Sequence, residues 1–165
     1  MFVDLTVVRQ TAASPAGHLV RHFTNRVARN FRRFHSSYMP WSTTFDLERG
    51  AIVFVATGVI TADELNEAVR TLYNDKRFNP DFRAFLDLEK ATGWRMSTSV
   101  VMDLGINRRF SRESRTALLV STASTYGMSR VFKTFAKKGW VQIFIDRVSA
   151  LAWLNEGLPP EKALS

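Results

Sequence analysis

Two kinds of apolar pattern alternate along the chain. Short runs of apolar and β-branched residues are typical of strands, whereas an apolar residue at every third or fourth position is typical of a helix packed on one face. The first pattern predicts strands over 42–46, 50–57, 82–88, 116–121 and 141–145. The second predicts helices over 61–73, 97–104, 125–137 and 146–154, with a loop over 91–96.

The order of these elements predicts the fold class. Strands that alternate with helices indicate an α/β domain, and the opening pair of strands adds an antiparallel edge. We therefore expect a single mixed, mostly parallel sheet with an N-terminal β-hairpin and covering helices. Local signals support the helix starts: Thr61 and Glu64 have capping-box spacing, and Ser97 and Asp146 are suited to cap the helices that follow them.

A basic segment precedes this predicted domain. Within 18–34 the apolar residues fall on one helical face and the arginines mostly on the others, which predicts an amphipathic helix. It can pack on its own domain, occupy a partner's groove, touch an anionic membrane surface or bind nucleic acid. Met39 is an alternative true start. We predict a basic extension over 1–40, a domain over 41–158 and a tail over 159–165.

Composition narrows the class of protein. Of 165 residues, 45% are hydrophobic, which is enough for a packed core, and the net charge is +8. Six arginines and one aspartate lie in the first 41 residues, so the domain itself is only mildly basic, and nucleic acid is not the favoured partner. The chain has no cysteine, which excludes disulfides and thiol chemistry. No apolar run has the length of a membrane span.

Several catalytic and cofactor motifs are absent. All three histidines, His18, His22 and His35, precede residue 42, so the predicted domain has neither a Ser-His-Asp set nor a histidine metal site. His18 and His22 have metal-ligand spacing, but Leu19 stands where the HExxH motif has glutamate. No glycine-rich phosphate motif occurs. The sequence thus predicts no cofactor and no metal.

Two clusters of charged residues remain as candidate functional sites. Asp87 and Glu89 share a face at the end of a predicted strand, so they fit either an acid–base pair or a solvated strand end. Arginines crowd the segment before the fourth strand, which suits phosphate or an acidic partner as well as a solvated loop. These arginines are Arg108, Arg109, Arg112 and Arg115.

The third candidate is the rim at the carboxyl ends of the strands, where ligands gather in open α/β sheets. Hydroxyl groups there can cap helices or be phosphorylated, since a phosphate meets the positive end of the helix dipole. The residues that we expect to act as a switch are Ser97, Thr98 and Ser99. The residues that we expect on a ligand or partner rim are Asp87, Ser121, Thr122, Ser124 and Tyr126.

Segments from Trp41 to Leu158 resemble the STAS domain, the fold of bacterial anti-sigma-factor antagonists, and in particular a STAS-like and CRAL-TRIO-like bacterial subgroup. The resemblance is carried by GVITADEL at 58–65, NDKRFNP at 74–80, FLDL at 85–88, YGMSRVF at 126–132, VQIFID at 141–146 and ALAWL at 150–154.

The resemblance implies a cytoplasmic, non-enzymatic signalling module. Its partner would be a kinase-like or anti-sigma-type regulator, and phosphorylation at Ser97, Thr98 or Ser99 would abolish binding. Met96 stands where the antagonist pattern has aspartate. The resemblance therefore indicates the position of the site and does not establish the phosphorylation mechanism. The alternative is a domain that binds a small molecule or lipid. A third hypothesis, a hydrolase that uses Asp87, is the least favoured.

Overall fold

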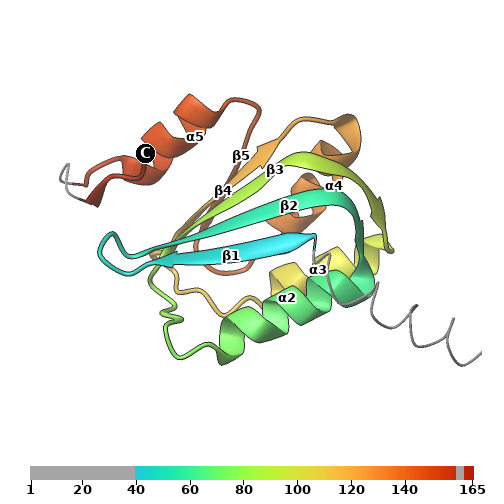
Figure 1. Cartoon of the computed structure of the whole chain (residues 1–165), viewed down its shortest axis with the longest axis horizontal. Coiled ribbons are helices and arrows are strands. Elements are labelled where there is room, and N and C mark those ends of the chain that lie inside the picture. Colours follow the sequence, from blue (N-terminus) through green and yellow to red (C-terminus); the bar gives the residue numbers. More distant parts are fainter. Residues whose placement is uncertain (1–39, 159–161) are drawn as a thin grey trace, which may run out of the picture. The chain divides into compact units, whose positions relative to one another are not determined.

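The computed structural model describes residues 40–158 and 162–165, in which five strands form one sheet in the order β1-β2-β3-β4-β5 (Figure 1). The strands are β1 (Trp41–Asp46), β2 (Ala51–Thr61), β3 (Arg83–Arg95), β4 (Arg115–Val120) and β5 (Trp140–Phe144). The helices are α2 (Ala62–Asn74), α3 (Thr98–Ile106), α4 (Ala123–Phe135) and α5 (Arg147–Asn155). The predicted order of strands and helices is confirmed.

The strand directions distribute the helices over the two faces of the sheet. β1 pairs with β2 antiparallel, and β2 to β5 pair in parallel, each with its neighbour in the chain. Because parallel crossovers are right-handed, strands in chain order collect their connecting helices on one face. Accordingly, α2, α3 and α4 lie on one face and α5 lies on the other (Figure 1). The predicted mixed, mostly parallel sheet with an N-terminal hairpin is confirmed.

Apolar side chains fill the space on both faces of the central strands. On the face of α2, α3 and α4, one cluster includes Ile60, Leu88 and Leu118, and a second includes Ile52 and Leu72. On the face of α5, a third cluster contains Phe85, Ala117, Leu119, Ala150 and Leu154. Burial on both faces explains why β4 appears in the sequence as a continuous apolar run instead of an alternating one.

β2 and β3 are longer than predicted, and the prediction of a loop over 91–96 is wrong. β3 continues to Arg95 because Ala91 to Arg95 pair with Gly58 to Thr61 of β2. The register of this pairing shifts twice, and Gly58 takes a φ of 71° next to one shift. Glycine adopts this left-handed conformation without steric cost, so the strand bends there and does not end.

The predicted start of α4 at Thr125 is also wrong, because the helix begins at Ala123 and Thr122 is its N-cap. The Thr122 hydroxyl accepts from the Thr125 amide at 3.1 Å, and the Thr125 hydroxyl accepts from the Thr122 amide at 3.1 Å. This reciprocal pair has the geometry of a capping box, with threonine in place of the usual glutamate.

Two predicted caps are confirmed. The Thr61 hydroxyl accepts from the Glu64 amide at 3.3 Å, and a Glu64 carboxylate oxygen accepts from the Thr61 amide at 2.9 Å. The Asp146 carboxylate accepts from the amides of Val148 and Ser149, which fixes the start of α5.

Several predictions fall outside the described residues. They concern the extension over 1–40 with its amphipathic segment 18–34, His18 and His22, and the alternative start at Met39. Part of the tail over 159–165 is outside them as well.

α3 and α4 cross at very short range. A Cβ atom on Gly105 would lie 3.0 Å from the Phe132 carbonyl oxygen and 3.0 Å from the Phe135 carbonyl carbon. Only a residue without a side chain permits backbone-to-backbone packing at this distance. The obstructing atoms belong to the helix backbone, which cannot move aside as a flexible side chain does.

We expect Gly105→Ala to lower the free energy of unfolding by about 1–3 kcal/mol, because the added methyl group forces α3 away from α4. Gly127→Ala in α4 is the matched control, since a Cβ atom there has no neighbour within 4 Å. That variant should gain stability by up to about 1 kcal/mol through helix propensity alone. Urea unfolding measures both, and equal stabilisation by the two variants would contradict the close crossing.

Candidate functional site

The predicted switch residues lie at the N-terminus of α3. Ser97 occupies the N-cap position, but its side chain makes no capping hydrogen bond. Its hydroxyl instead lies 2.7 Å from the Ser99 hydroxyl. Ser97, Thr98 and Ser99 are all exposed, and the first turn of α3 has no acidic residue. The positive end of this helix is therefore open to an added anion.

The predicted rim residues at the start of α4 are also at the surface. Ser121 donates its hydroxyl hydrogen to the Glu89 carbonyl oxygen at 2.7 Å, whereas Thr122 is occupied as the helix cap. Ser124 is exposed, and Tyr126 is 44% exposed. Because α3 and α4 pack together and run in the same direction, their N-termini lie at the same end of the helical layer. The structure thus brings the switch and these rim residues to one end.

Asp87 and Glu89 do share a face, and Arg147 of α5 lies between them. One Nη of Arg147 donates to both carboxylates, at 2.6 Å for Glu89. The hydrogen bonds from Glu89 and then Asp87 raise the pKa of Arg147 above its ordinary value. The guanidinium also lies 5.4 Å from the centre of the Phe85 ring. Both carboxylates of the proposed acid–base pair are therefore tied to a cation.

The four arginines of the predicted patch do not form one surface. Arg108 is only 4% exposed, and it donates to the Lys138 carbonyl oxygen and the Thr116 hydroxyl. Burial lowers its pKa to about 10. Arg115 is tied to Glu156 and to the Trp153 carbonyl oxygen of α5. Arg109 and Arg112 are exposed.

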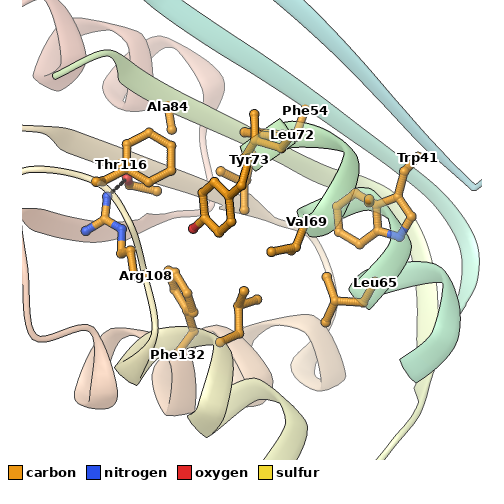
Figure 2. Close-up of a pocket in the computed structure, with 14 residues that line it drawn as sticks. Trp41, Phe54, Leu65, Val69, Leu72, Tyr73, Ala84, Arg108, Thr116 and Phe132 are labelled. Atoms are coloured by element: carbon orange, nitrogen blue, oxygen red, sulfur yellow. Dashed lines mark hydrogen bonds between the residues drawn. The ribbon is translucent and has the colours of Figure 1, made fainter. Parts of the chain in front are cut away.

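An apolar cavity of about 70 Å³ lies between the sheet, α2 and the α3–α4 pair (Figure 2). Arg108 and Thr116 lie at one end of it and Trp41 at the other, with Tyr73, Val69 and Phe132 between them (Figure 2). A second cavity of about 40 Å³ shares Trp41, Leu65 and Phe132 with the first. The two cavities therefore follow one seam of the helical layer.

A groove on the outer side separates α2 from α3. It has a volume of about 320 Å³ and is lined by polar and apolar groups in similar measure. It shares Val69, Tyr73 and Leu104 with the first cavity. The Tyr73 hydroxyl accepts from the Arg109 amide at 3.2 Å, and burial raises the pKa of this tyrosine. The groove and the cavity are therefore neighbours that share part of their lining.

Apart from Arg108 and Arg109, which were predicted as part of a basic patch, the residues of the cavity and the groove were not predicted from the sequence. Tyr73 and Trp41 come from separate elements, and no local spacing connects them with Arg108. Arg147 was missed for the same reason, because 60 positions separate it from Asp87. The only sign of Arg147 in the sequence is that it directly follows Asp146, the residue predicted to cap a helix.

Two further findings concern the described residues alone. Their aspartate and glutamate side chains do not gather in groups of three or more that could hold a metal ion. None of the helices in this part of the chain combines the length and apolar character needed to cross a membrane.

The chain matches no protein-family model and no curated protein. It is similar to the solved structure of an uncharacterized protein of the DUF3478 family from Shewanella loihica PV-4, which has a SpoIIAA-like fold. The sequences are 19% identical, the TM-score is 0.48, and the match covers 69% of this chain and 91% of that one. That protein has the STAS-like fold predicted here, while our assignment of fold class rests on the strand order and directions described above.

We expect Arg147→Met to lower the free energy of unfolding by about 1–3 kcal/mol, because the largely buried Asp87 carboxylate loses its cation. Arg70→Met is the matched control, since its pair with Glu67 is exposed and should contribute less than about 0.5 kcal/mol. Adding Asp87→Asn to Arg147→Met should restore part of the loss. Chemical denaturation of the four proteins tests this, and indistinguishable effects of the two arginine changes would argue against it.

Proposed function

We propose that this domain is a non-enzymatic regulatory module, bacterial and cytoplasmic as the STAS resemblance implies. It binds a protein partner through the end of the helical layer where α3 and α4 begin. Modification of Ser97, Thr98 or Ser99 controls that binding. A kinase-like or anti-sigma-type regulator is the class of partner that fits the resemblance.

The observation that carries this proposal is the open N-terminus of α3. Three exposed hydroxyls precede or begin the helix, and the Ser97 side chain caps no amide. A phosphate there would gain from the helix dipole and from amide donors, so the modified state would be stable without a new binding pocket. It would also add about two negative charges to a surface that a partner has to approach.

The state of the acidic pair supports a role in binding over one in catalysis. Asp87 and Glu89 both bond to the Arg147 guanidinium, and Asp87 is only 8% exposed, which leaves it little access to a substrate. This arrangement fits a structural anchor for α5 on the sheet.

Ser99→Asp is the test of the switch. Affinity capture from a lysate of the source organism should recover a partner with the wild-type chain, and about tenfold less of it with the variant, since burying an unpaired charge at an interface costs free energy. Asn79→Asp is the control, because it adds the same charge in the loop before β3 and keeps an acceptor for the Asp81 amide. Equal recovery with both variants would count against the proposal.

One observation favours the alternative function, binding of a small molecule. The cavity between α2 and the α3–α4 pair is lined mostly by apolar side chains and borders a groove that polar and apolar groups line in similar measure. Well-packed interiors leave few voids larger than a water molecule. The two functions are compatible, because the groove and the start of α3 involve different residues.

A further inference from the structure

β5 leaves one edge of the sheet open. It pairs with β4 alone, and the Trp140 amide donates to the Ser114 carbonyl oxygen on that side at 2.8 Å. Successive residues of a strand direct their backbone groups to opposite edges, so the amides and carbonyls of Val141 and Ile143 point away from β4. Within the described part of the chain, no group bonds to them there. An extended peptide can therefore pair with this edge.

The strand at this edge has neither of two common features that protect sheet edges. β5 together with Ile145 has the sequence WVQIFI, which contains no charged residue and no proline. β1, at the opposite edge, has the sequence WSTTFD, with three hydroxyl side chains and an aspartate. Charged residues and proline are common on exposed edge strands because they prevent pairing with another chain. Their absence from β5 indicates an edge suited to pairing.

Large apolar side chains are exposed at both ends of this edge. Trp140, at the start of β5, is 65% exposed, and Ile145, directly after its end, is 81% exposed. Val148, in the first turn of α5, is 76% exposed. A strand added to a sheet edge gains affinity from its backbone and specificity from side-chain contacts of this kind. The occupant should therefore carry apolar residues.

The same edge is positively charged. α4 carries Arg130 and Lys133, and Lys137 and Lys138 lie between α4 and β5. All four side chains are exposed, and none of them forms an ion pair within the described residues. Lys133 donates to the Gln142 side chain of β5 at 2.7 Å, so this cation lies at the strand itself.

Helix chemistry accounts for only part of this charge. A lysine in the last turn of a helix suits the helix dipole, which explains Lys133. Lys137 and Lys138 lie beyond the C-cap of α4, and no aspartate or glutamate occurs between residues 114 and 145 to balance them. Cations that surround one strand without counter-ions favour an anionic occupant.

Charge argues against the chain itself as that occupant. In a twofold symmetric contact the same surface lies on both sides, so two copies that met at β5 would bring these cations together. The first 39 residues contain six arginines and one aspartate, so they are basic as well. Nucleic acid would contact the cations but leave the backbone groups of β5 unpaired. An acidic extended peptide uses both the charge and the open backbone.

We propose that β5 binds an acidic peptide segment of a partner protein as a sixth strand of the sheet. The backbone of the peptide pairs with Val141 and Ile143. Its apolar side chains contact Trp140 and Ile145, and its carboxylates meet the cations of α4 and of the α4–β5 loop. This site goes beyond the proposed function, because it lies at the sheet edge and not at Ser97–Ser99, so either can fail alone.

Three fluorescent eight-residue peptides separate the parts of the proposal in anisotropy titrations of the full chain. The first consists of Glu-Val repeats. The second, of Glu-Pro repeats, has the same charge but cannot form a strand, and the third, of Lys-Val repeats, has the strand pattern with the opposite charge. We expect the Glu-Val peptide to bind at least about tenfold more tightly than either of the others.

Each contrary result contradicts one part of the proposal. Equal affinity of the Glu-Pro peptide would overturn strand pairing, and equal affinity of the Lys-Val peptide would overturn the role of charge. Absence of saturable binding of the Glu-Val peptide at about 1 mM would overturn the site. Tighter binding of an oligothymidylate of the same length would make nucleic acid the occupant and overturn the peptide.

Amide hydrogen exchange locates the bound peptide. At saturating Glu-Val peptide, exchange at Val141 and Ile143 should slow by about tenfold or more, while exchange at Ser42–Phe45 of β1 stays unchanged. Slowing at β1 instead would overturn the location. Exchange at Val141 and Ile143 in the free chain as slow as at Gln142, whose amide faces β4, would mean that the chain itself covers the edge, and it would also overturn the proposal.

Two double variants test the cations. Lys137→Gln with Lys138→Gln should weaken binding of the Glu-Val peptide by about tenfold, because two charge contacts are lost. Lys76→Gln with Lys90→Gln is the matched control, since it removes the same charge at exposed positions away from β5 and should change the affinity by less than about twofold. Equal effects of the two double variants would overturn the role of the cations beside β5.

Discussion

The backbone contact between α3 and α4 at Gly105 determines how the helical layer is arranged. It draws α4 onto α3 until backbone meets backbone, so these two helices behave as one unit on the sheet. α2 packs on β1 and β2 and is separated from that unit by the groove. The α3–α4 side of the layer is therefore closed, while the groove and the two apolar cavities lie along the side of α2.

Polar groups of the domain occupy two contrasting settings. On the α5 face, Arg147 bonds to both carboxylates of β3 and so joins α5 to the sheet. At the start of α3, hydroxyls lie at a positive helix end without capping it. The first setting serves the fold, whereas the second leaves an open helix end at the surface.

Periodicity and capping chemistry predicted the architecture because they act between residues close in the chain. Thr61 with Glu64 and Asp146 with Ser149 are such local pairs, and each marks the start of a helix correctly. The extension of β3 was missed because it depends on pairing with β2, 33 to 34 positions earlier in the chain, and on the bend at Gly58. Gly93 in that stretch resembled a loop signal.

The candidate sites depend on contacts between residues that are far apart in the chain, and the spacing of residues along the sequence does not predict such contacts. The clustering of arginines before β4 suggested one basic patch, but Arg108, in the loop after α3, is buried, and Arg115 is tied to α5. The cavities join residues from β1 to β4 and from α2, α3 and α4, so only the fold reveals them. Ser97, Thr98 and Ser99 lie at a helix start as predicted, because a helix start is a local feature of the chain, but the predicted Ser97 cap is not made.

The most direct measurement follows the four tryptophan indole N–H signals by nuclear magnetic resonance under rising xenon pressure, because xenon enters empty apolar cavities. Trp41 and Trp94 line the cavities, whereas Trp140 is 65% exposed on β5 and Trp153 packs against Phe144 on the α5 face. The account predicts saturable shifts for the signals of Trp41 and Trp94 and none for the other two. Shifts shared equally by all four signals, or no shift for Trp41 and Trp94, would contradict it.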